Sequence, residues 1–128
     1  MPLYMLKHLQ EESDSWKRHL AFIREENIFL KDSLSQAVKN SGVKTSLNDM
    51  ENFLNQSIRL DDVHALLRHD VAVFDKLLLS EKLKDGQTGQ KLEYEVKKNR
   101  INIKRYFEEF YNFKTEFNNY LRENIDEY

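Results

Sequence analysis

The chain contains no cysteine, one proline and only three glycines among its 128 residues. Without cysteine there is neither a disulfide framework nor a thiolate metal site, so the marks of a small extracellular scaffold are missing. This absence favours a reducing, cytoplasmic location. Because proline and glycine punctuate turns and helix ends, their scarcity also predicts long, uninterrupted segments of secondary structure.

Long apolar runs are missing as well. No window of the sequence approaches the roughly 18 apolar residues of a membrane-spanning helix. The first residues, MPLYMLKHLQEESDSW, lack the basic stretch followed by an apolar run that is typical of a signal peptide. We therefore expect a protein that does not span a membrane and is not exported by that route.

Neither sign of charge is in excess. The chain has 20 Lys and Arg residues against 22 Asp and Glu residues, which leaves a net charge of −2. Long-range attraction to nucleic acid or to an anionic membrane depends on the summed field of the protein. Binding to either partner is therefore not expected from the composition and would have to come from a local patch.

The few helix-breaking residues divide the chain into three segments. Pro2 lies at the start, Gly42 marks a first loop, and Gly86 and Gly89 mark a second, with Thr88 as the expected cap of the third segment. We predict helices at about 3–40, 46–85 and 89–126, all within one domain that spans 1–128.

Each segment carries core residues at alternating spacings of three and four, which is the heptad pattern of coiled coils. Strands are excluded because period-two alternation is absent and the segments are too long. The predicted core stripes are Leu6, Leu9, Ser13, Trp16, Leu20, Ile23, Asn27, Leu30, Leu34 and Ala37; Met50, Phe53, Ser57, Leu60, His64, Leu67, Val71, Phe74 and Leu78; and Leu92, Val96, Asn99, Ile103, Tyr106, Phe110, Phe113, Phe117 and Tyr120.

Loops of about six residues bring successive helices together in antiparallel orientation. The sequence therefore predicts an all-α fold, an antiparallel up-down-up bundle of three long helices with coiled-coil-like packing. With Trp16 in its first helix, this plan resembles a spectrin-type repeat; the resemblance covers only the general plan and Trp16, and it implies no function. Folding the chain back at each loop centre places Trp16 level with Val71 and Tyr106, His64 level with Ile23 and Phe110, Asn27 level with Ser57 and Tyr120, and Ser13 level with Asn99.

Further apolar residues lie outside these stripes. They either widen the core or cover a second face that meets another chain. We expect self-association, as a homodimer. The residues are Phe22, Ile28, Phe29, Val63, Leu66, Val73, Leu77, Leu79, Phe107, Tyr111 and Leu121.

His64 is the one residue of the core stripes with metal-binding chemistry. Asp61 lies one turn before it, as in the Glu-x-x-His pairs of helical di-metal proteins. His19 and Glu26 from the first helix, or glutamates of the third, would have to complete the site. We favour a core-edge histidine satisfied by Asp61, a tyrosine or water, and predict neither a metal nor a cofactor.

The third segment holds five basic residues within nine positions, Lys97, Lys98, Arg100, Lys104 and Arg105. Such a patch could contact phosphates. Because glutamates flank it closely, a solvated helix face is the better interpretation, and nucleic-acid binding is the weaker hypothesis.

No nucleophile signature, phosphate-binding glycine loop or matched pair of carboxylates is found in the sequence, so we do not expect an enzyme. Asn27 and Asn99 are interpreted as residues that fix the register of the helices. The leading hypothesis is a protein-protein interaction or scaffolding module whose partner the sequence does not identify.

Overall fold

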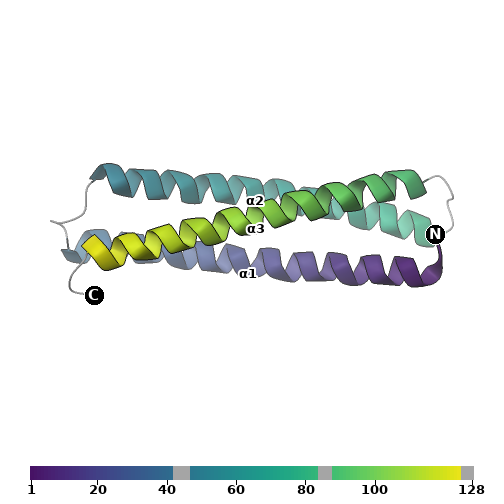
Figure 1. Ribbon diagram of the computed structural model, residues 1–128, viewed down its shortest axis with the longest axis horizontal. Helices are drawn as coiled ribbons and strands as arrows, with labels where there is room; N and C mark the ends of the chain where they lie inside the picture. The colour runs from purple at the N-terminus through teal and green to yellow at the C-terminus, as the bar shows by residue number, and fades with distance from the viewer. Residues whose placement is uncertain (42–46, 84–87, 125–128) are drawn as a thin grey trace.

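The computed structural model describes residues 1–41, 47–83 and 88–124. It contains three long helices, α1 (Leu3–Ser41), α2 (Leu47–Lys82) and α3 (Gly89–Asn124). Figure 1 shows them side by side in an elongated bundle, with α1 and α3 running in one direction and α2 in the other. The predicted all-α, antiparallel up-down-up architecture is confirmed. The predicted turns around Gly42 and Gly86 lie outside the described residues.

The helices begin where backbone carbonyls can accept the first helical hydrogen bonds. The Pro2 carbonyl accepts from the amides of Met5 and Leu6 at 3.1 and 3.2 Å. The Thr88 carbonyl accepts from the Leu92 amide at 2.8 Å, which is the behaviour of a residue at the N-cap position. The Thr88 hydroxyl donates to Glu81 at 2.9 Å and so ties the start of α3 to the end of α2.

The core consists of the predicted stripes. All ten stripe residues of α1 are buried, and so are those of α2 and α3 except Met50, Phe53 and Tyr120, which are partly exposed. Trp16 packs edge-to-face on Phe74, with ring centroids 5.3 Å apart. The hydrophobic effect thus acts on one stripe of each helix, and burial of these stripes holds the three helices together.

The register of α1 against α2 is also as predicted. Asn27 donates from Nδ2 to the Ser57 carbonyl at 3.1 Å, and the Ser57 hydroxyl donates back to Asn27 Oδ1 at 2.8 Å. Asn27 and Asn99 are both buried. The expectation that polar residues share levels in the core therefore holds for Asn27 and Ser57.

α1 and α3 are parallel and connected by a ladder of side-chain contacts. Arg100 forms two hydrogen bonds with Glu12, 88 residues away along the chain. The same separation recurs where the His19 ring stacks on Phe107 and where Lys114 pairs with Glu26. This constant offset places Ser13 close to the level of Asn99, as expected.

The register of α2 against α3 differs from the expectation by about one helical turn. His64 contacts Tyr106 instead of Phe110, with ring centroids 6.2 Å apart. α2 also ends at Lys82 and not near 85 as expected. Each α2 residue meets α3 nearer to the start of that helix.

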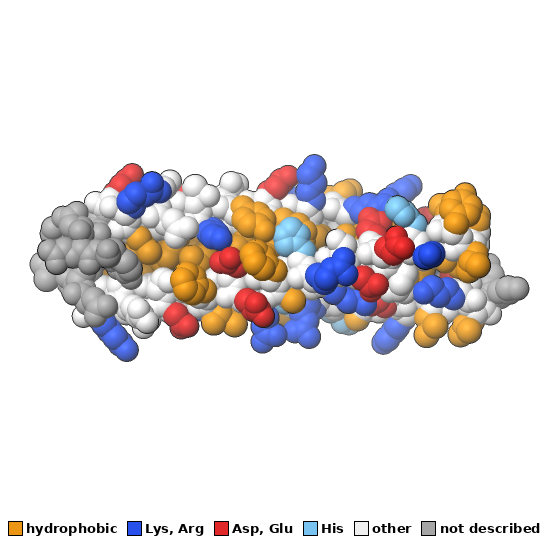
Figure 2. All heavy atoms as spheres, turned by 90° about the horizontal axis from the view of Figure 1, so that it is seen from below, with side chains coloured by type: hydrophobic (Ala, Val, Ile, Leu, Met, Phe, Trp, Pro, Cys, Tyr) orange, Lys and Arg blue, Asp and Glu red, His pale blue; other side chains and the backbone are white. Residues whose placement is uncertain are grey.

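Apart from the partly buried Val73, the apolar residues outside the stripes divide into two groups. Val63, Leu77, Phe107 and Leu121 pack partly buried against the core, which they widen. The second group is exposed and consists of Phe22, Ile28, Phe29, Leu66, Leu79 and Tyr111. Figure 2 views the molecule from the α1 side and shows hydrophobic side chains gathered near the middle of this face, among charged ones. Within the described ranges, no helix has the length and apolarity needed to cross a membrane.

Candidate functional site

A groove of about 620 Å³ runs between α1 and α2. Its floor includes three buried side chains, Leu20, His64 and Val71, and two exposed arginines, Arg24 and Arg68, also line it. For neither arginine is an ion pair with another described residue found. The groove therefore combines an apolar floor and one imidazole with two solvated cations.

The protonation state of His64 follows from its contacts. Its Nε2 atom lies 2.8 Å from the carbonyl oxygen of Leu20. Because a carbonyl can only accept, Nε2 carries the proton and, in the neutral ring, Nδ1 is the unprotonated acceptor. Burial lowers the pKa of His64 below its ordinary value of 6.5 and outweighs the hydrogen bond to the Leu20 carbonyl, which raises it; the nearby charges of Arg68 and Arg24 lower the pKa further. The imidazole is therefore neutral at pH 7.

The remaining metal candidates are engaged with partners other than His64. Asp61 accepts hydrogen bonds from Asn27 at 2.8 Å and from Lys31, both on α1. His19 faces α3, where Nε2 lies 3.0 Å from the Tyr111 hydroxyl oxygen.

Glu26 also faces α3, where it pairs with Lys114 at 3.4 Å. Across residues 1–41, 47–83 and 88–124 no three His, Asp or Glu side chains gather in an arrangement that could hold a metal. The geometry gives no support to the proposed set of His64, Asp61, His19 and Glu26. Adjacent helix positions point about 100° apart, and this separates His19 from the Leu20 side that meets His64.

The partner of His64 also differs from the expectation. We expected Asp61, a tyrosine or water, whereas the ring bonds to the Leu20 backbone. This contact cannot be read from side-chain patterns, since every residue carries a carbonyl. It depends on the exact level at which α1 passes α2.

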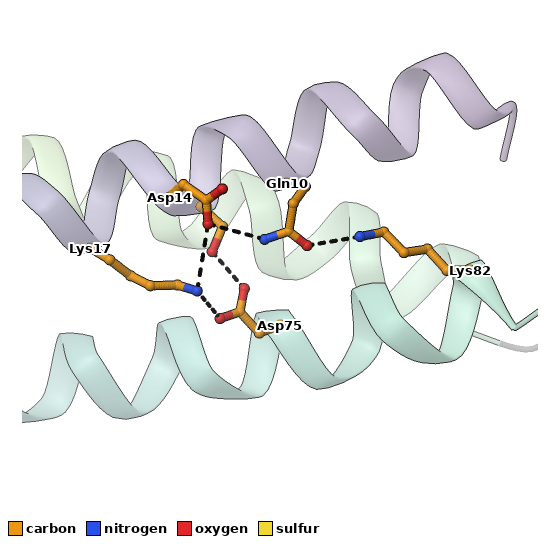
Figure 3. Close-up of polar contacts among 6 residues, drawn as sticks. Gln10, Asp14, Lys17, Asp75 and Lys82 are labelled. Carbon is orange, nitrogen blue, oxygen red and sulfur yellow. Dashed lines mark hydrogen bonds and ion pairs between the residues drawn. The ribbon is translucent and has the colours of Figure 1, made fainter.

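A second polar centre joins α1 to α2 nearer the N-terminus (Figure 3). Asp75 accepts a hydrogen bond from the Ser13 hydroxyl at 2.5 Å and forms an ion pair with Lys17 at 2.6 Å. Gln10, about one turn before Ser13 on α1, accepts a hydrogen bond from Lys82 at 2.8 Å. Sequence reasoning missed the role of Asp75. Its position beside the core residue Phe74, across from the polar stripe residue Ser13, was the available signal.

Two of the basic residues on α3 form ion pairs with acidic residues of the bundle. Lys98 pairs with Glu95 at 3.0 Å and with Asp70 at 3.9 Å. Arg100 binds Glu12 through two hydrogen bonds of 2.6 and 2.7 Å. Lys97, Lys104 and Arg105 are exposed. The Lys97–Arg105 face is thus partly neutralised, which gives no support to nucleic-acid binding.

The outer surface of α1 is the third candidate. Phe22 and Phe29 are 49% and 66% exposed, while the other six phenylalanines of the chain are buried in the core or packed against it. The two side chains are seven residues apart and therefore lie on the same face of the helix. Ile28, which is 47% exposed, lies beside them toward the α1–α2 groove. We call Phe22, Ile28 and Phe29 the outer α1 surface.

The sequence matches no protein-family model, no curated protein and no solved structure.

Proposed function

We propose that this protein is a non-enzymatic protein-protein interaction module that associates with a second copy of itself through the outer α1 surface. The main observation in its support is the exposure of Phe22 and Phe29 at the middle of the long helix α1. Aromatic side chains are enriched at the centres of protein interfaces, where their burial supplies much of the binding free energy.

The rest of the bundle supports this proposal by providing a rigid frame. The α1 helix is tied to α2 by the Ser13–Asp75 and Asn27–Ser57 hydrogen bonds and to α3 by the Glu12–Arg100 pair. A surface held on a rigid helix loses little conformational entropy on binding. The absence of cysteine suits a cytoplasmic scaffold, which we include in the proposal.

The test is sedimentation equilibrium on the wild type and on the double variant Phe22→Ser/Phe29→Ser. We expect a dimer that dissociates on dilution for the wild type and a monomer for the variant. The matched control is Leu66→Ser/Leu79→Ser, which removes two exposed apolar side chains from α2 and should leave the dimer intact. A wild type that remains monomeric up to its solubility limit would refute the proposal.

A further inference from the structure

We infer that the second copy docks on α1 in antiparallel orientation, about a two-fold axis that passes beside Glu25. This inference rests on the proposed self-association and adds to it the direction and register of the interface. It follows from the charges that surround the two exposed phenylalanines.

A second stripe of heptad spacing runs along the solvent side of α1, opposite the core. It alternates steps of four and three, as the core stripe does, and is apolar only near its middle. Its residues, in chain order, are Glu11, Ser15, Arg18, Phe22, Glu25, Phe29, Asp32, Gln36 and Lys39. Its two phenylalanines flank Glu25 at the middle of the stripe, and the other charged members lie toward its ends.

The charged members of this outer stripe are exposed, and among the described residues none of them forms an ion pair. Their neighbours on the flanks of α1 behave differently. Lys17 and Lys31 pair with aspartates of α2, while Glu12 and Glu26 pair with basic residues of α3. The flanking charges thus fix the bundle itself, and the outer stripe keeps its charges available for a partner.

The charges on the two sides of Glu25 lie at equal distances from it and are opposite in sign. Arg18 and Asp32 lie seven residues to either side of it, and Glu11 and Lys39 lie fourteen to either side. A two-fold axis at Glu25 therefore places Arg18 opposite Asp32 of the second copy and Glu11 opposite Lys39. The symmetry repeats both contacts, which gives four pairs of opposite charge.

A parallel dimer would bring like charges together instead of opposite ones. Every charge would then face the same residue of the second copy, so like charges would meet at all five positions, whereas the antiparallel arrangement brings like charges together only at Glu25. Such contacts are repulsive, and they select against the parallel orientation.

The aromatic centre fits the same axis. Phe22 lies three residues before Glu25 and Phe29 four residues after it. Antiparallel docking therefore brings Phe22 of one copy level, within one residue, with Phe29 of the other. The four rings form two aromatic pairs, one on each side of the axis with Glu25 between them, and contacts within each pair add to the burial of apolar area.

Charge reversal tests the pairing. Arg18→Asp should weaken dimerisation by about tenfold, since it replaces two attractive contacts by repulsive ones, and Asp32→Arg should do the same. The double variant Arg18→Asp/Asp32→Arg should restore the wild-type affinity. Lys104→Asp, a reversal at an exposed position of α3, is the matched control and should change nothing.

Disulfide trapping tests the axis, because the natural chain has no cysteine. Glu25→Cys should cross-link two copies on mild oxidation, since residue 25 meets itself at the axis. Gln36→Cys lies on the same stripe away from the axis and should not cross-link. Efficient cross-linking through position 36 would indicate a parallel dimer and overturn the inference.

The proposed self-association and its antiparallel register can be refuted separately. A monomeric wild type would remove both the proposed function and this inference. A wild-type dimer that is lost in Phe22→Ser/Phe29→Ser but unaffected by Arg18→Asp would leave the proposed function in place and refute only the antiparallel register.

Discussion

Asn27 and Asn99 are the same residue type at equivalent core positions, yet their surroundings differ. Asn27 exchanges hydrogen bonds with Ser57 and also donates to Asp61. Both side-chain atoms of Asn99 are buried and have no hydrogen-bond partner among the described residues. A buried amide with hydrogen-bond partners contributes to stability. An amide without partners loses its hydrogen bonds to water on burial and forms none in the protein, which is destabilising.

Replacement by leucine, which has a similar volume, should therefore have opposite effects at the two sites. Asn99→Leu is expected to raise the free energy of unfolding by about 1 kcal/mol, and Asn27→Leu to lower it by about 2 kcal/mol because Ser57 and Asp61 lose their partner. Urea denaturation followed by circular dichroism measures both values. A destabilised Asn99→Leu would show that this amide has a partner in solution.

Two phenylalanines allow a similar comparison for apolar burial. Phe110 has no exposed surface, so Phe110→Ala should lower the free energy of unfolding by about 3–5 kcal/mol through lost burial and a cavity. Phe29→Ala removes an exposed ring and should change the free energy of unfolding of the dissociated monomer by less than about 0.5 kcal/mol. A cost below about 1 kcal/mol for Phe110 would contradict its core position.

At the scale of the helices, the contact between α1 and α2 depends on a titratable group. The neutral His64 ring bonds to the Leu20 carbonyl, while Arg24 and Arg68 oppose its protonation and Asp61 favours it. Since burial lowers the pKa of His64 in the folded state, the unfolded chain takes up this proton first as the pH falls. The contribution of His64 to stability is therefore complete above its ordinary pKa of 6.5 and is lost as the pH decreases toward the lowered value.

Unfolding experiments between about pH 7.5 and about pH 5 should show this dependence. The difference in unfolding free energy between the wild type and His64→Gln should shrink as the pH falls, because glutamine does not titrate. His8→Gln changes an exposed histidine and serves as the control. A difference that does not vary with pH would contradict the lowered pKa.

The whole molecule is held by one core that all three helices share. Trp16 is the only tryptophan and packs on Phe74 of α2, so its fluorescence reports on the contact between helices. Circular dichroism reports on the helices themselves. Because none of the helices buries its apolar stripe alone, we expect both signals to change in a single coincident transition. Helical signal that persists after the fluorescence change would contradict this cooperativity.

Self-association adds a concentration dependence to that transition. A dimer that forms only from folded chains raises the melting temperature as the protein concentration increases. The wild type should show this increase and Phe22→Ser/Phe29→Ser should not. Equal behaviour of the two proteins in a calorimetric dilution series would argue against the proposed interface.

The sequence alone determined the helices, their order and the residues of the core. Heptad spacing is a local property of each helix, and the scarcity of glycine and proline leaves few places where the chain can turn. These two features were sufficient to predict that Leu20, Phe74 and Phe110 are buried, and that Asn27 lies level with Ser57.

The tertiary structure decided the contacts that depend on the distance and level between helices. The register of α2 against α3 places His64 beside Tyr106, and the crossing of α1 over α2 gives His64 the Leu20 carbonyl and gives Ser13 the Asp75 carboxylate. The tertiary structure also decided that Phe22 and Phe29 are exposed and that Phe107 is partly buried, although all three lie outside the core stripes. Local periodicity fixes which side of a helix is apolar, but only the packed helices determine which of the flanking residues are covered.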